Sequence, residues 1–270
     1  MSGKNLKFEK LFNRGENAVI IAVDHGMFAG PIPGLINIKE TLGKINPSVD
    51  AVLMSAGTLK TNREFFNFKG APMPIVRINW SDVYCMPWKY NSGATVTAKT
   101  VEDVLKLGAE AVLVSLTIAT DDPERDAMNV ENFCELQREA EQFGIPVIGE
   151  FFPAFSEELK PEEMHEKVLI SCRILAELGA DLIKTFYTND FKAVTSSCNI
   201  PILGLGADKT SQLNALELAK KEIEDGCKGV VFGRNAFQVK NPFNFQSALL
   251  EVVKKGASPK DMVSKYELVD

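Results

Sequence analysis

The sequence predicts a single (β/α)8 barrel of the TIM-barrel type, an α/β fold, and three observations lead to this class. Short apolar runs rich in β-branched residues recur eight times along the 270 residues. Their apolarity is continuous instead of alternating, which is typical of parallel strands covered on both faces. Helical patterns separate the runs with short links, and eight such units in about 250 residues match a closed barrel.

The expected strands are 18–24, 51–56, 73–79, 109–117, 145–152, 181–186, 200–206 and 229–233. Glycines that stop helical patterns mark the helix ends between them, at Gly108, Gly144, Gly179 and Gly226. The last of these helices starts at a serine cap, Ser211. A final helical pattern, "NPFNFQSALLEVVKKG", ends the series.

A doubly wound open sheet is the alternative fold. It normally begins with a G-x-G-x-x-G turn, whereas the first expected strand here runs into "VDHGMFAG". No linker rich in proline or glycine divides the chain. We therefore expect an N-terminal helical extension at 1–16, across the bottom of the barrel, and one barrel domain at 17–270.

Composition excludes several classes of function. The net charge of −6 argues against a nucleic-acid-binding surface. No apolar stretch approaches the ~20 residues of a membrane span, and the polar N-terminus lacks a signal-peptide core. Five scattered cysteines without a CxxC pair, and only two histidines, predict reduced thiols and no metal site. We expect a cytoplasmic protein with no nucleic-acid or membrane partner.

Lys184 stands within the apolar run "DLIKTF", the sixth expected strand. Side chains alternate along a strand, so Lys184 shares a face with Leu182 and Phe186. Inside the barrel an amine would be desolvated, which favours the neutral form that attacks carbonyl groups to give a Schiff base. The alternatives are a structural ion pair and an outward side chain that reaches solvent.

Two carboxylates are candidate partners of Lys184. Asp24 ends the first expected strand, and a carboxylate at a barrel mouth can move a proton beside an iminium. Glu150 lies in the fifth strand on the face of Phe152, and it would be near Lys184 if that face points inward. The alternatives are a capping role for Asp24 and an outward ion pair for Glu150.

Candidate substrate-binding residues lie at other strand ends. Gly204 and Gly206 end the seventh strand, and Gly233 and Arg234 end the eighth, where barrels frequently bind phosphate through backbone N–H groups. The alternative is that the glycines serve turns. Two further candidates are His25, which could instead be part of a turn, and Arg77, which could point outward.

Three segments carry a family resemblance that runs over nearly the whole chain: "AVDHGMFAGPIPGL", "ADLIKTFYTND" and "VVFGRNAFQ". The chain resembles the archaeal-type class I fructose-bisphosphate aldolases. That family also includes aminodideoxyheptulosonate synthases and the thiolase that processes a phosphorylated quorum-signal breakdown product. The resemblance implies a (β/α)8 barrel, a phosphorylated ketose-type substrate and a homo-oligomer, often a decamer.

The same resemblance implies roles for individual residues and no metal or cofactor. It assigns the Schiff base to Lys184 and acid–base chemistry to Asp24. It assigns phosphate binding to the Gly204–Gly206 and Gly233–Arg234 strand ends.

One segment departs from the family pattern. The aldolases and heptulosonate synthases carry Tyr-Pro-Arg-Gly at the end of the fifth strand, where the tyrosine donates and accepts a proton. Here the segment reads "EFFPAF", so Phe152 replaces the tyrosine and Ala154 the arginine. A phenyl ring has no proton to give, and the thiolase branch also lacks the tyrosine. Glu150 is the candidate substitute, with water or Asp24 alone as alternatives.

The leading hypothesis is a metal-independent class I aldolase-type enzyme that makes or breaks a carbon–carbon bond in a phosphorylated keto or ketose substrate, such as fructose bisphosphate. The first alternative is a thiolase-type acyl transferase acting on a phosphorylated diketone with a thiol acceptor such as coenzyme A. The second is a non-catalytic barrel that binds a sugar phosphate. Loss of the tyrosine supports the last, and retention of Lys184 together with Asp24 opposes it.

Overall fold

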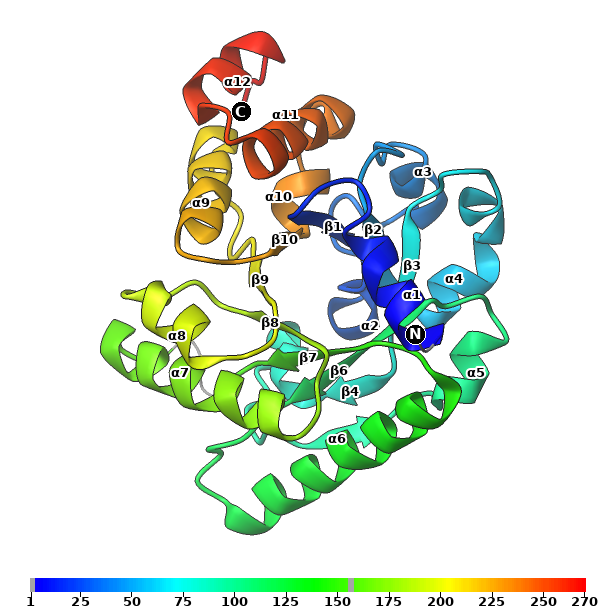
Figure 1. Ribbon diagram of the computed structural model, residues 1–270, viewed down its shortest axis with the longest axis vertical. Coiled ribbons are helices and arrows are strands. Elements are labelled where there is room, and N and C mark those ends of the chain that lie inside the picture. Colours follow the sequence, from blue (N-terminus) through cyan, green and yellow to red (C-terminus); the bar gives the residue numbers. More distant parts are fainter. Residues whose placement is uncertain (1–2, 155–157) are drawn as a thin grey trace.

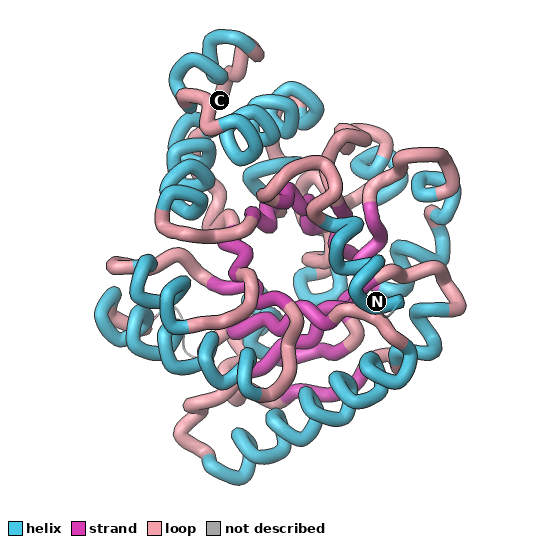
Figure 2. Tube along the Cα trace, viewed as in Figure 1, coloured by secondary structure: helices cyan, strands magenta, loops and turns pink. Residues whose placement is uncertain are grey.

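Eight parallel strands close into a barrel, which confirms the expected fold class (Figures 1 and 2). The structure is a computed structural model that describes residues 3–154 and 158–270. The strands follow one another around the ring in the order β1, β10, β9, β8, β7, β6, β3, β2. Their bounds are β1 Ala18–Ala22, β2 Ala51–Ser55, β3 Met73–Arg77, β6 Ala111–Leu116, β7 Val147–Phe151, β8 Leu182–Thr185, β9 Ile202–Leu205 and β10 Gly229–Phe232.

Helices surround the barrel and cover its outer face (Figure 2). The longer ones are α6 Pro123–Phe143, α7 Pro161–Glu177, α9 Gln212–Glu224 and α11 Pro242–Lys255. The shorter ones are α1 Gly3–Leu11, α2 Gly26–Ala29, α3 Ile38–Leu42, α4 Ala56–Thr61, α5 Val101–Leu105, α8 Phe191–Ser197, α10 Arg234–Phe237 and α12 Pro259–Lys265. Local signals set several ends: Gly144 and Gly256 take the left-handed conformation after α6 and α11, and the Ser211 side chain caps α9.

Alternation along the strands separates two apolar layers. On β8, Leu182 belongs to the cluster inside the barrel, whereas Ile183 belongs to the layer between strands and helices. The same alternation applies to β1, where Ile20 points inward and Ile21 outward. The interior cluster is apolar toward the N-terminal ends of the strands. Toward the C-terminal ends of the strands, charged side chains take the inward positions. Barrel enzymes carry their active sites at this end.

Helix α1 lies against the N-terminal ends of the strands. Leu11 is buried with the interior apolar cluster, and Phe8 and Phe12 pack against it. The amine of Lys7 donates at 2.9 Å to the carbonyl of Gly144, which lies in the turn between α6 and β7. These contacts cover one end of the barrel and leave the charged end as its mouth.

The segment between β3 and β6 forms a small antiparallel pair, β4 Asn79–Ser81 and β5 Thr95–Thr97. Two short 3₁₀ helices lie between them, η2 Asp82–Tyr84 and η3 Met86–Trp88; a third, η1 Arg63–Phe66, precedes β3. The Asn79 amide donates to the backbone of Ser115 on β6 at 2.8 Å, which ties the pair to the barrel. As a result η2 is held over the barrel mouth.

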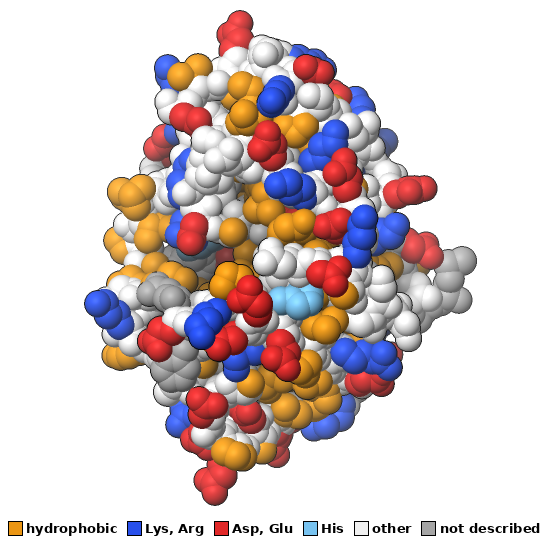
Figure 3. All heavy atoms as spheres, turned by 90° about the vertical axis from the view of Figure 1, so that its left-hand side faces the viewer, with side chains coloured by type: hydrophobic (Ala, Val, Ile, Leu, Met, Phe, Trp, Pro, Cys, Tyr) orange, Lys and Arg blue, Asp and Glu red, His pale blue; other side chains and the backbone are white. Residues whose placement is uncertain are grey.

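The outer surface carries charges of both signs. On the face shown in Figure 3, acidic and basic side chains are interspersed with apolar ones, so no extended patch of one sign covers it. Among the described residues, no helix combines the length and apolarity that crossing a membrane requires.

Candidate active site

Four charged side chains meet inside the barrel mouth, each on an inward-facing strand position. Lys184 and Glu150 are paired in register on neighbouring strands. Each lies two positions after an apolar residue that faces the barrel interior. Arg77 on β3 and Asp24 beyond β1 have the same parity. The exposed fractions are 8% for Lys184, 1% for Glu150, 2% for Arg77 and 4% for Asp24. The structure therefore shows the inward orientation that the sequence left open for Lys184, Glu150 and Arg77.

Glu150 and Arg77 connect the four charges into one network. One carboxylate oxygen of Glu150, Oε1, pairs with the Lys184 amine, and the other, Oε2, accepts from Arg77. Arg77 Nε also donates to Asp24 Oδ2 at 2.6 Å. Two carboxylates thus balance two cations, as buried charges require.

The cations decide the protonation of both carboxylates. Burial alone would raise the pKa of Asp24, but Arg77 and Lys184 outweigh it and lower that pKa to about 2. For Glu150, burial is again opposed by Arg77 and Lys184, which hold its pKa below the ordinary value. Both groups are therefore ionised at neutral pH and can accept protons.

Tyr84 and Ser115 complete the network, and the sequence analysis identified neither. The Tyr84 hydroxyl donates to Glu150 Oε2 at 2.8 Å and lies 3.0 Å from the Ser115 hydroxyl, which in turn accepts from Arg77. Burial, followed by the charge of Glu150, raises the pKa of Tyr84 well above 10. The phenol is therefore neutral at physiological pH and carries a proton.

An aromatic layer roofs these groups. Phe152 packs on Tyr84 with ring centroids 4.5 Å apart and on Phe186 at 5.0 Å. Phe28 also packs on Tyr84, with ring centroids 4.7 Å apart. The rings lie over the charged network and limit water at the reacting centre, which strengthens its electrostatic interactions.

His25 joins the mouth of β1 to that of β10. Its Nδ1 lies 3.7 Å from Asp24 Oδ1, and its ring fills the space that any side chain at Gly233 would need. Burial lowers the pKa of His25 against the pull of Asp24, and Lys184 and Arg234 add to the lowering. A neutral imidazole is therefore expected at pH 7.

Of the predicted phosphate-binding residues, Arg234 and Gly206 lie at the ends of β9 and β10, whereas Gly204 faces away from the barrel interior. Arg234 begins α10, and its guanidinium donates to Asp208 at 2.9 Å across the ends of β9 and β10. Gly206 lies between the same ends, where its N–H donates to the Val231 carbonyl at 3.1 Å. Gly204 has outward parity and faces the carboxyl of Glu222 on α9. A role in phosphate binding stays a prediction for all of them.

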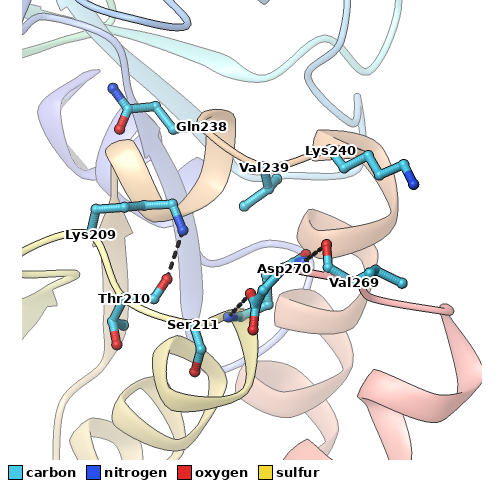
Figure 4. A pocket seen from close by; sticks show the side chains of 9 residues that line it. Lys209, Thr210, Ser211, Gln238, Val239, Lys240, Val269 and Asp270 are labelled. Atoms are coloured by element: carbon cyan, nitrogen blue, oxygen red, sulfur yellow. Dashed lines mark hydrogen bonds between the residues drawn. The ribbon is translucent and has the colours of Figure 1, made fainter.

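Two hollows lie near the strand ends. One, of about 390 Å³, opens beside Asp24 and includes the hydroxyls of Ser55, Thr58 and Thr61. None of its lining residues is a lysine or an arginine: Val23, Asp24, Gly26, Met27, Gly30, Pro31, Leu35, Ile38, Ser55, Gly57, Thr58 and Thr61. The other, of about 300 Å³, lies outside the barrel and does not include the charged network (Figure 4). It is lined by Lys209, Thr210, Ser211, Gln212, Gln238, Val239, Lys240, Val269 and Asp270. Of the four charged side chains in the barrel mouth, Asp24 lines the first hollow and none lines the second.

Within residues 3–154 and 158–270, no three or more His, Cys, Asp or Glu side chains are grouped so that they could hold a metal ion.

Comparisons with known proteins give relatives along the whole chain. The family profile described as DeoC/LacD family aldolase matches residues 18–239. An uncharacterized aldolase of Saccharolobus solfataricus is 32% identical over 265 residues, covering 95% of this chain and 96% of the relative. The 3-hydroxy-5-phosphonooxypentane-2,4-dione thiolase of Photorhabdus laumondii is 28% identical over 269 residues, covering 98% and 86%.

Solved structures agree with the sequence relatives. A Schiff-base-forming fructose-1,6-bisphosphate aldolase, studied through its reaction intermediates, superposes with a TM-score of 0.80. The two chains are 26% identical, and the match covers 93% of this chain and 99% of the other.

Proposed function

The chain belongs to the DeoC/LacD family of aldolases, and on that premise we propose a class I aldolase-type enzyme that makes or breaks a carbon–carbon bond in a phosphorylated keto substrate. The reaction proceeds through an iminium on Lys184. The observation that carries this proposal is the buried Lys184–Glu150 pair inside the barrel mouth. A buried lysine at the C-terminal end of a barrel strand, with a carboxylate placed to take its proton, is a lysine prepared for nucleophilic attack.

Glu150 activates the lysine. Its Oε1 accepts the proton of the Lys184 ammonium, and the neutral amine attacks the substrate carbonyl carbon. Glu150 then returns this proton to the carbinolamine hydroxyl, which leaves as water and gives an iminium that carries the same positive charge as the ammonium it replaced. The carboxylates of Glu150 and Asp24 already surround that charge, so little reorganisation is needed to stabilise it.

The iminium drives the carbon–carbon step. When the bond breaks, its electron pair forms the C=C bond of an enamine, and the C=N pair becomes the lone pair on Lys184 Nζ. The ionised Asp24 borders the 390 Å³ hollow, where the outgoing part of the substrate would lie. Its carboxylate accepts the proton of the substrate hydroxyl whose oxygen becomes the carbonyl of the released fragment.

The phosphate of the substrate binds at the ends of β9 and β10. Support comes from Arg234, whose only described ionic partner is the highly exposed Asp208. Exchange of that exposed carboxylate for a phosphate keeps a charge-assisted contact. The hollow beside Asp24 offers hydroxyls instead of cations and suits the uncharged, hydroxylated end of the molecule.

Acyl transfer is the second candidate function. The similarity to the thiolase covers 98% of this chain, and the absence of a tyrosine at Phe152 favours that branch. In this case the same iminium would activate a phosphorylated diketone, and a thiol such as coenzyme A would accept the acyl group.

Borohydride trapping tests the proposal. Dihydroxyacetone phosphate and borohydride together should add the mass of the reduced ligand to the peptide that contains Lys184. The Lys184→Met variant should take up no label. Label on a different lysine, or none with a panel of keto phosphates, would show that the Schiff-base mechanism is wrong. Addition of coenzyme A to a phosphorylated diketone would distinguish the thiolase reaction.

A further inference from the structure

Tyr84 places a phenol beside the carboxylate that activates Lys184. The two oxygens of Glu150 divide their partners: Oε1 faces the lysine amine and Oε2 accepts from the Tyr84 hydroxyl at 2.8 Å. The amine and the phenol are therefore separated by a single carboxylate group, so a substrate carbon bonded to the amine would lie within the same cluster as the phenol. The formation of the Schiff base at Lys184 does not use this hydroxyl.

The phenol is held in place from three sides. Its ring packs against Phe152 and Phe28, and the guanidinium of Arg77 lies 4.7 Å from the ring centroid. The short helix that carries it is tethered by Asp82, whose carboxylate accepts from the backbone N–H of Gly93 at 2.9 Å. Such fixed orientation is what a proton-transfer group needs.

The hydrogen bonds around the hydroxyl converge on Glu150. The Ser115 hydroxyl accepts from Arg77 and from Tyr84, the latter at 3.0 Å, and donates to Glu150 Oε2 at 3.4 Å. Tyr84 in turn donates its own proton to Glu150. The phenol oxygen can therefore give its proton to Glu150 while it gains another, with the Ser115 hydroxyl close by at 3.0 Å.

We infer that Tyr84 donates and accepts the proton of the carbon-centred step, as the phenol that Phe152 does not supply. The inference rests on the proposed function of Lys184. When the C–H bond beside the iminium breaks, its proton moves to the Tyr84 oxygen as the original Tyr84 proton passes to Glu150 Oε2. The C–H electron pair forms the enamine C=C bond, and the C=N pair returns to Lys184 Nζ. Reversal of these transfers protonates the enamine.

Deuterium exchange separates this step from Schiff-base formation. Wild-type protein is mixed with dihydroxyacetone phosphate in D2O, and NMR follows loss of the proton at the carbon beside the carbonyl. Borohydride labelling of Lys184 is measured in the same samples. Tyr84→Phe keeps the packing ring and removes only the hydroxyl. We expect labelling near the wild-type rate and exchange slower by about 10²–10⁴-fold, the usual contribution of a positioned acid or base.

Tyr90→Phe is the matched control, because Tyr90 lies in the same loop, is 48% exposed and packs on Trp88 outside the network. It should change neither measurement. A Tyr84→Phe variant that labels and exchanges like the wild type would overturn the inference and leave the Schiff base intact. Labelled wild-type protein without exchange would also overturn it. Absence of label in the wild type would instead refute the proposed function on which it rests.

A fluorinated tyrosine at position 84 distinguishes chemistry from packing. Fluorination makes the phenol more acidic with little change in shape, and the charged groups that face it, Glu150 and Arg77, stay in place. The alkaline limb of the exchange rate should then move to lower pH. A limb that does not move would show that Tyr84 only supports the site.

Discussion

Glu150 is the residue that joins the two halves of the charged network. It accepts from Arg77 on one oxygen and from Lys184 on the other, and it is 1% exposed. Removal of one partner from a buried ion pair leaves a buried charge without compensation, which is strongly destabilising. A test of its chemical role must therefore keep its shape and check the fold.

Glu150→Gln tests whether this residue takes the lysine proton. The amide keeps the volume but cannot accept a proton, so borohydride trapping of Lys184 with dihydroxyacetone phosphate should slow by about 10²–10⁴-fold. Thermal unfolding confirms that the variant folds. Glu110→Gln is the control, since Glu110 pairs with Lys10 at the opposite end of the barrel. Trapping at the wild-type rate in a folded Glu150→Gln variant would remove Glu150 from this role.

Asp24 should make stability depend on pH in the acidic range. Its pKa is lowered from 3.8 to about 2 in the folded protein, so the unfolded state binds the proton more readily. The stabilisation is fully present above the unfolded pKa and is lost as pH falls from about 4 toward 2, about 2 kcal/mol in total. Urea unfolding from pH 5 to pH 3 should show the stability advantage of the wild type over Asp24→Asn shrinking. A constant difference would contradict this assignment.

Single residues could be predicted from the sequence where a strand pattern located them. Lys184, Asp24, Glu150 and Arg77 interrupt apolar strands near their ends, and alternation then leaves only a choice between two faces. Tyr84 could not be found in this way, because it lies in a short 3₁₀ helix without periodicity, and its partners are distant in sequence.

At the scale of elements, β9 and α9 fit together through a glycine. Gly204 has outward parity, and a Cβ atom there would overlap the carboxyl of Glu222. Both oxygens of that carboxyl are buried without a hydrogen-bond partner among the described residues, and burial raises its pKa well above the ordinary value. Glu222 is therefore a neutral, tightly packed acid.

Gly204→Ala should lower the free energy of unfolding by about 1–3 kcal/mol, because overpacking strains the interface. In a Glu222→Ala background the same substitution should cost much less, because the space is open. Urea unfolding of the four proteins gives the coupling free energy. Gly57→Ala is the control, since the nearest atom to a Cβ there lies at 3.8 Å. Equal costs in the two backgrounds would show that Glu222 is not what requires the glycine.

All eight barrel strands could be predicted from continuous apolar runs, because a parallel strand buried on both faces has no polar side to obscure it. Helix α6 begins at Pro123, after the Asp122 cap, and so extends further toward the N-terminus than its apolar pattern indicates. The β4–β5 pair was not predicted. Its strands have three residues each and are partly exposed, so they leave little apolar signal.

At the scale of the whole molecule, barrel closure assembles the site. Arg77 on β3 reaches Asp24 beyond β1 and Glu150 on β7, although one strand separates β3 from each of them around the ring. Only a closed barrel places these strand ends around one centre. The apolar strand runs predicted the barrel and the position of Lys184, whereas these contacts across the interior required coordinates.

The same closure places the proposed phosphate site beside the lysine strand, because β9 separates β8 from β10. Arg234→Ala should raise KM for a phosphorylated substrate by roughly 10- to 150-fold more than for its unphosphorylated analogue. This ratio is the loss of binding expected when one charge-assisted hydrogen bond is removed. Steady-state kinetics with both compounds measures the ratio. Arg173→Ala, an exposed arginine paired with Glu177 on α7, should leave it unchanged. Equal effects on both compounds would exclude Arg234 from phosphate binding.

The most direct test of the account is a crystal structure of the protein after borohydride reduction with dihydroxyacetone phosphate. We predict continuous electron density from Lys184 Nζ to the former carbonyl carbon, with the phosphate near Arg234 and the Tyr84 hydroxyl facing the adjacent carbon. A ligand bonded to another lysine, or one that lies in the barrel mouth without a bond to Lys184, would contradict the central claim.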